Sequence, residues 1–275
     1  MKPEVQHALK RYLLTVADDE IVIGYRDSEW TGIAPIVEED IAFSSLAQDE
    51  IGHARLYYTL VAELTGKDAD HLALLREKDA YYHARLLEQR ATPKYHPSGE
   101  HESGGDWAFA VARRFLYDLF DDLRIQDHTA SSYAPLAGAA RKIQREERYH
   151  LKHGEVWWET LATGSLEARE RLERALERMW PDLLGLFEAA PGEDLLVAEG
   201  ILPRTTADLL EPWLERAWPY FDRYSLPFPG NREAQGWALR IQAAQGGRQG
   251  QHGPGWDELY EEMTMVRKLE PEGVW

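Results

Sequence analysis

Two Glu-x-x-His motifs, at 50–53 and 147–150, contain the side chains that carboxylate-bridged metal sites use. In a helix, residues three positions apart share a face, so each motif would direct one carboxylate and one imidazole to the same point. A third copy, at 4–7, is expected by chance in an acidic chain with ten histidines. The motifs alone are therefore weak signals, and their surroundings decide what they mean.

An acidic residue precedes each of the two motifs at nearly the same distance. Glu20 lies 30 residues before the glutamate of the first motif, and Asp118 lies 29 residues before that of the second. A turn signal separates each acid from its motif, at 31–35 and at 131–135, so each unit is predicted to be a helical hairpin. With a rise of about 1.5 Å per residue, the acid and the motif of each hairpin fall at nearly the same height.

Two such hairpins packed together would bring four carboxylates and two imidazoles into one core. Ferritin-like di-iron proteins build their site in this way, from a Glu on each of two helices and a Glu-x-x-His on each of the other two. Carboxylates and neutral imidazoles that leave open positions suit Fe(II) and oxygen activation. The residues predicted to converge are Glu20, Glu50, His53, Asp118, Glu147 and His150, with Asp in place of one lone Glu.

Other acids and histidines compete for these places. Asp121 shares a helix face with Asp118, but it would lie about 4.5 Å out of level with the second motif, so we favour Asp118. His153, one turn beyond the second motif, is expected to be a neighbour of the site and not a ligand. His96 and His101 lie in a stretch rich in Gly, Pro and Ser and are expected to be exposed loop residues.

Composition limits the classes of function. The formal charge is −17, which argues against nucleic acid as a partner because phosphate binding needs clustered Lys and Arg. The absence of Cys removes thiolate zinc sites, iron–sulfur clusters and cysteine nucleophiles. No apolar run reaches about 18 residues, and the N-terminus lacks the plan of a signal peptide, so we expect a cytoplasmic protein with no membrane segment.

Helical periodicity runs through the chain without persistent strand-like alternation, which predicts an all-α fold. We expect a single ferritin-like domain over 1–275, with a core bundle at about 4–162 and a helical extension at about 163–275. Gly52 lies inside a predicted helix, where glycine costs about 1 kcal/mol relative to alanine. We therefore expect it to have a packing role, in which it allows close approach beside the site. Helices are predicted at about 4–30, 35–65, 69–90, 107–129, 135–162, 166–188, 205–221 and 257–269.

Short stretches spread over nearly the whole chain are similar to those of one protein family. They are Ala17–Asp19, Gly24–Arg26, Ser28–Gly32, Ala34–Ala42, Arg148–Leu151, Gly247–His252 and Glu261–Met263. They resemble the C-type subunit of bacterial phenylacetyl-CoA epoxidase, the ring-activating enzyme of phenylacetate (phenylacetic acid) catabolism. C-type subunits typically pair with a catalytic A-type paralogue and have lost part of the metal set. This chain has the whole set and resembles the A-type pattern at those positions.

The resemblance implies roles for the converging residues and for two of their neighbours. Asp49 and Glu146 would accept hydrogen bonds that fix the imidazoles from the opposite hairpin. The implied cofactor is a pair of iron ions, with a manganese–iron pair as the alternative. The implied iron ligands are Glu20, Glu50, His53, Asp118, Glu147 and His150.

Oxygen chemistry needs electrons, and the sequence has no dinucleotide-binding glycine fingerprint and no Cys for a cluster. A separate reductase is therefore an expected partner. The other expected partners are an aromatic acyl-CoA substrate and a second subunit, in a homodimer or in a hetero-oligomer with a paralogue.

Three functions agree with these residues. The first is a di-iron monooxygenase component that epoxidises the ring of phenylacetyl-CoA, or of a similar aromatic acyl-CoA, with O2 and external electrons. The second is a structural, C-type subunit of the epoxidase complex without turnover of its own. The third is another ferritin-like activity, such as iron storage, peroxide removal or a manganese–iron oxidase, although the long segment after Gly164 argues against storage.

Overall fold

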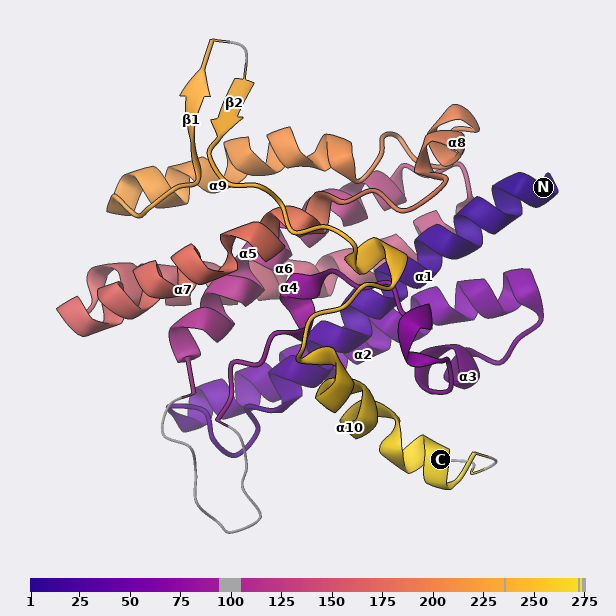
Figure 1. The fold of residues 1–275 in the computed structure, drawn as a ribbon, viewed down its shortest axis with the longest axis horizontal. Coiled ribbons are helices and arrows are strands. Elements are labelled where there is room, and N and C mark those ends of the chain that lie inside the picture. The colour runs from indigo at the N-terminus through magenta and orange to yellow at the C-terminus, as the bar shows by residue number, and fades with distance from the viewer. Residues whose placement is uncertain (94–104, 235, 272, 274–275) are drawn as a thin grey trace.

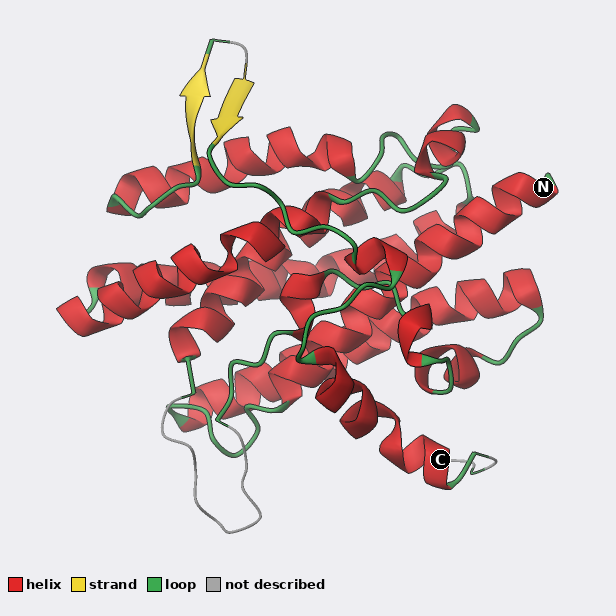
Figure 2. Cartoon of the chain, in the orientation of Figure 1, coloured by secondary structure: helices red, strands yellow, loops and turns green. Residues whose placement is uncertain are grey.

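A computed structural model of the protein describes residues 1–93, 105–234, 236–271 and 273, so His96 and His101 lie outside the described residues. The described chain is mostly helical (Figure 2), which confirms the all-α class. In this part of the chain, no helix is both long and apolar enough to cross a membrane.

Two helical hairpins form the centre of the molecule (Figure 1). In the first, α1 (Pro3–Ser28) packs along α2 (Val37–Thr65), and in the second, α5 (Trp107–Thr129) packs along α6 (Ala134–Thr163). Contacts between α2 and α6 join the two hairpins. This is the ferritin-like four-helix arrangement that the repeated acid and motif predicted.

Local signals in the sequence account for the ends of these helices. Pro3 and Pro135 stand in the first turns of α1 and α6, where a missing backbone N–H costs no helical hydrogen bond. The side chain of Asp106 caps α5 by accepting from the backbone N–H of Phe109 at 3.0 Å. Gly66 ends α2 in the left-handed conformation, which favours glycine.

The predicted third helix, at 69–90, is wrong as one continuous element. The structure breaks it into α3 (Ala69–Leu74), the 3-10 turn η1 (Lys78–Ala80) and α4 (Arg85–Glu88). The buried carboxylates of α1 explain the break, because they accept backbone N–H groups from this stretch. Tyr82 N–H donates to Asp18 at 2.7 Å, and Ala84 N–H donates to Asp19 at 2.9 Å.

The second half of the chain covers the α5 side of the bundle, where both α7 and α9 contact α5. It also contains a short antiparallel hairpin, which pairs Gly230 with Leu239 and projects from the bundle in Figure 2. The sequence did not predict this hairpin. The elements are α7 (Leu166–Leu184), η2 (Gly185–Phe187), α8 (Glu193–Ala198), η3 (Ala207–Leu209), α9 (Leu210–Tyr224), β1 (Gly230–Glu233), β2 (Gly236–Leu239), η4 (Gly247–Gln249) and α10 (Trp256–Leu269).

Close packing beside the predicted site depends on Gly24 of α1. A Cβ atom at Gly24 would lie 3.1 Å from the Cβ of Glu50 and 3.2 Å from the carbonyl oxygen of Ala47. The expectation for Gly52 is wrong, because that residue is exposed and a Cβ there would meet no atom of the described chain within 4 Å. The side of α2 that carries Glu50 faces α1, whereas Gly52 lies on another side.

The two glycines give a matched test of this packing. Gly24→Val should lower the free energy of unfolding by about 2 kcal/mol, because a branched side chain would force α1 away from α2. Gly52→Val should change it by less than about 0.5 kcal/mol, because it enters open space on a helix surface. Urea denaturation followed by circular dichroism measures both, and equal effects would contradict the assignment of the contact to Gly24.

Candidate metal centre

All six predicted residues lie in the core of the four-helix bundle, and none is more than 2% exposed. Glu20, Glu50 and His53 offer ligand atoms within 4.8 Å of one another, and so do Glu50, Glu147 and His150. Asp118 belongs to neither group, but its Oδ1 atom lies 2.8 Å from Nε of Arg114, whose Nη2 atom lies 2.8 Å from His150 Nδ1. We call these six side chains the carboxylate–imidazole cluster.

The two imidazoles present their Nδ1 atoms to the cluster and their Nε2 atoms to acids outside it. His53 Nε2 lies 2.7 Å from Glu146 Oε2, and His150 Nε2 lies 3.3 Å from Asp49 Oδ2. An ionised carboxylate can only accept a hydrogen bond, so we assign the hydrogen to Nε2 in each ring. Asp49 and Glu146 thus each contact the imidazole of the opposite hairpin, which leaves both Nδ1 atoms directed inward.

Two glutamates lie between the imidazoles. Glu147 Oε1 is 3.5 Å from His53 Nδ1 and 3.1 Å from His150 Nδ1. Glu50 reaches the same two nitrogens with different oxygens, at 3.8 Å from His53 through Oε2 and at 3.2 Å from His150 through Oε1. Each of the two carboxylates therefore faces both imidazoles.

Several acceptor atoms of the cluster are buried without a hydrogen-bond partner among the described residues. Buried polar atoms are normally paired, so a concentration of unpaired ones needs an explanation. A divalent cation would satisfy them, and oxygen atoms with imidazole nitrogen are suitable ligands for iron or manganese. The side chains therefore fit a metal ion. The unpaired atoms include Glu20 Oε2, Glu50 Oε2, His53 Nδ1, Asp118 Oδ2 and both carboxylate oxygens of Glu147.

The pKa values show how strongly these protein groups interact. Burial raises the pKa of Glu20 and that of Asp118 well above the ordinary values. Burial also opposes ionisation of Glu50, but Arg114 beside it holds the pKa of that carboxyl well below the ordinary value. Burial disfavours the charged form of His53, yet contact with Glu50 raises the pKa of its imidazole to about 9. Metal ions entering the cluster must therefore displace protons.

Two buried arginines, which the sequence reasoning missed, also belong to the site. Arg114 Nε lies 2.8 Å from Asp118 Oδ1, and its Nη2 atom contacts Glu50 and lies 2.8 Å from His150 Nδ1. The second arginine, Arg124, donates to Glu20 Oε1 at 2.7 Å. The spacing of four residues between Arg114 and Asp118 was an available signal, because such pairs meet on one face of a helix.

Asp121 and His153, which compete with the predicted ligands in the sequence, have defined contacts in the structure. Asp121 is buried, and it accepts a hydrogen bond from Arg124 Nε at 2.7 Å. Burial raises the pKa of Asp121 to about 7, although Arg124 opposes the shift. His153 bonds to Glu39 Oε2 at 2.7 Å and belongs to neither ligand group. Each acid is thus paired with a buried arginine, Asp118 with Arg114 and Asp121 with Arg124, and the choice of Asp118 as a ligand stays a prediction.

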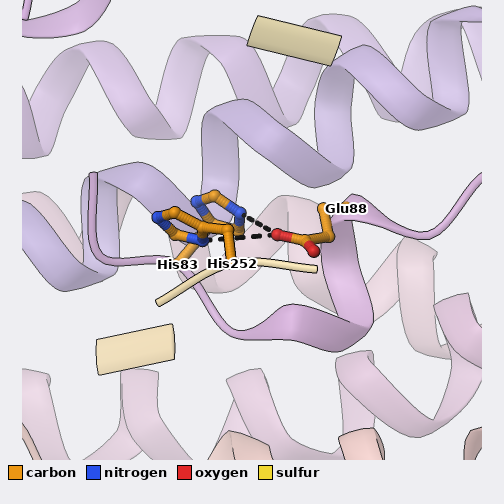
Figure 3. Close-up of side chains that lie close together, drawn as sticks. All are labelled: His83, Glu88 and His252. Atoms are coloured by element: carbon orange, nitrogen blue, oxygen red, sulfur yellow. Dashed lines mark hydrogen bonds and ion pairs between the residues drawn. The ribbon is translucent and has the colours of Figure 1, made fainter. Parts of the chain in front are cut away.

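A second buried group, His83, Glu88 and His252, joins segments that are far apart in the sequence (Figure 3). Both imidazoles face the Glu88 carboxylate, with His83 Nε2 at 2.9 Å and His252 Nδ1 at 3.3 Å from Oε2. The rings are stacked, 4.1 Å apart and 10° from parallel, so their in-plane lone pairs do not converge on one ion. The group instead ties the 250–255 segment to the stretch before α4, where His252 Nε2 donates to the Tyr81 carbonyl.

The fold and the carboxylate–imidazole cluster define a ferritin-like helical protein with buried histidine and glutamate groups that can hold a metal ion. The sequence matches the family model described as "Phenylacetic acid catabolic protein" over residues 1–275. The chain belongs to this family, which agrees with the resemblance seen in its short motifs.

Two relatives from Escherichia coli (strain K12) are different subunits of one enzyme, 1,2-phenylacetyl-CoA epoxidase. The chain is 28% identical to the C subunit of that enzyme over 270 residues, which cover 97% of this chain and 99% of the relative. It is also 28% identical to the A subunit over 178 residues, which cover 65% of this chain and 52% of the relative. The match to the C subunit is the more extensive.

The His83–Glu88–His252 group predicts a dependence of stability on pH. Burial alone would raise the pKa of Glu88, but the hydrogen bonds with His252 and His83 lower it to about 2 from its ordinary value of 4.5. The stabilisation is therefore present above pH 4.5 and is lost as the pH falls towards 2. Glu88→Gln should lower the free energy of unfolding by about 3 kcal/mol at pH 7.

The difference between Glu88→Gln and the wild type should shrink between pH 4.5 and 3, which urea denaturation at several pH values measures. The matched control is Glu4→Gln, an exposed position on α1 that should leave stability unchanged. A difference for Glu88→Gln that stays constant across this range would contradict the assigned role.

Proposed function

We propose that this protein is the metal-holding component of an oxygenase that epoxidises the ring of phenylacetyl-CoA or of a similar aromatic acyl-CoA. The observation that carries the proposal is the convergence of two Glu-x-x-His motifs and two lone acids in one buried core. The family supports it, because the named relatives are subunits of an epoxidase of this substrate. Electrons would come from a separate reductase.

The proposed ligands form two positions. Glu20 and His53 would hold one iron ion, Asp118 and His150 would hold the other, and Glu50 and Glu147 would bridge them. Bound iron would supply the binding and reduction of O2, with one oxygen atom entering the ring and the other leaving as water after uptake of two electrons and two protons.

The other contacts of the site have supporting roles under this proposal. Asp49 and Glu146 would hold the hydrogen on Nε2 of each imidazole, so that Nδ1 faces the cluster. Burial of the cluster excludes bulk water from the oxidising centre, which protects reactive species from side reactions.

A cavity of about 370 Å³ between α1, α2 and α3 is a candidate for the acyl-CoA ring. Its size falls within the range of small-molecule pockets, and most of its lining is apolar. Ile21 and Ile51 in its wall directly follow Glu20 and Glu50, so the cavity adjoins the helix segments that carry the proposed ligands. Tyr25 and Tyr58 add aromatic surface to the same wall.

A structural role without turnover is the second candidate function. Arg114 and Arg124 favour it, because buried guanidinium groups neutralise some of the same carboxylates that would bind metal. The longer match to the C subunit of the epoxidase also favours it. Under this alternative the cluster would stabilise the bundle and an attached paralogous partner, and iron would not be required.

Metal content separates the two candidates. The protein purified from iron-supplemented cells should contain bound iron, and Glu147→Ala should remove it because that carboxylate faces both imidazoles. Glu4→Ala, in the chance copy of the motif, should retain the wild-type content. Elemental analysis measures all three, and a folded wild-type protein that takes up no iron would favour the structural role.

Single-turnover chemistry tests the proposed activity. The iron-loaded protein, mixed with O2, phenylacetyl-CoA and a reductant that supplies two electrons per product, should yield a product that contains one additional oxygen atom. Mass spectrometry with isotopically labelled O2 identifies the source of that atom. An iron-loaded protein that consumes O2 without modifying the acyl-CoA, alone and with a paralogous partner, would contradict the proposed substrate.

A further inference from the structure

Arg114 lies at one of the two proposed metal positions of the carboxylate–imidazole cluster. We call the position of Glu20 and His53 the first position and that of Asp118 and His150 the second. Its guanidinium is buried, and its nitrogens face Asp118 at 2.8 Å, His150 Nδ1 at 2.8 Å and Glu50 Oε1. These are three of the groups that would hold an ion in the second position. The side chain of Arg114 therefore lies where a cation of that position would meet its ligands.

At the first position, the buried guanidinium is that of Arg124, whose contact with the proposed ligands is with one atom, Glu20 Oε1. Glu20 Oε2, Glu50 Oε2 and His53 Nδ1 are buried atoms without a hydrogen-bond partner in the described part of the chain. Both carboxylate oxygens of Glu147 are also buried without a hydrogen-bond partner among these residues. Arg124 binds the remaining oxygen of Glu20, Oε1, and leaves Oε2 available. The four side chains thus direct oxygen and nitrogen atoms to one point, where an entering cation would displace the protons that they hold.

A guanidinium and a metal ion exclude each other at these distances. Arginine stays protonated in proteins and has no lone pair to donate to a metal. Two cations a few ångströms apart in a buried site repel strongly. Glu50, Glu147 and His150 lie close enough together to hold an ion, but two of the three already contact Arg114 Nη2.

We infer that Arg114 occupies the second metal position, so that the chain by itself holds one divalent ion, bound by Glu20, Glu50, His53 and Glu147. A second ion binds only when Arg114 is removed or leaves the cluster. This inference rests on the metal-holding role proposed above and makes the two halves of a sequence repeat functionally different.

The two histidines of the motifs, His53 and His150, provide the sharpest test. They occupy equivalent positions in the sequence repeat, but Arg114 contacts His150. Each variant is dialysed anaerobically against Fe²⁺, and the bound iron per chain is measured by elemental analysis. The wild type should bind one ion. His53→Ala should lose this ion, whereas His150→Ala should retain it, because His150 Nδ1 faces the guanidinium.

Removal of the guanidinium tests the inference from the other direction. Arg114→Gln should bind two ions, because the amide leaves the second position without its cation. Arg113→Gln is the matched control, since Arg113 is equally buried but bonds to Asp27 and to the Gln89 carbonyl. It should bind one ion, and circular dichroism establishes that both variants are folded.

The possible results separate this inference from the proposed function. Two ions in the wild type, equal losses in the two histidine variants, or one ion in folded Arg114→Gln would overturn the role of Arg114 and leave the metal-holding function intact. The absence of iron from the wild type and from folded Arg114→Gln would overturn both. If Arg114→Gln does not fold, the pair of histidine variants decides the question.

Discussion

The need to balance negative charge inside a helical bundle shapes most of this structure. Glu20, Glu50, Asp118 and Glu147 come from four helices and are removed from water in one core. Buried carboxylates are stable only when they are protonated, hydrogen-bonded or matched by cations. Imidazoles and guanidinium groups meet part of this need, and the unpaired acceptor atoms mark the part that a metal ion would meet.

The same requirement organises elements outside the four-helix core. Asp18 and Asp19 of α1 bind backbone amides of the stretch between η1 and α4, which therefore cannot continue as a helix. Arg248, from the segment before α10, reaches back to Asp19 at 2.6 Å and is itself buried. The C-terminal segment is thus tied to the first helix through ion pairs as well as through apolar packing.

The chain combines a long similarity to one epoxidase component with a complete set of acids and Glu-x-x-His motifs. It is similar to the C subunit of the epoxidase along nearly its whole length, yet its core has both copies of the repeated set. The arginines beside this set make its two halves chemically different. A guanidinium can fill the place of a metal ion electrostatically, but it cannot bind or reduce oxygen.

The sequence by itself determined the helical class, the two central hairpins and the residues that converge in their core. These follow from short-range rules, because the helical period and the spacing of acids around a turn fix which side chains share a level and a face. Only the tertiary structure placed the guanidinium of Arg114 on Asp118, Glu50 and His150, broke the predicted helix at 69–90, and joined His83 and Glu88 to His252. Each of these depends on partners from distant segments, and neither periodicity nor local spacing encodes which buried charges will meet.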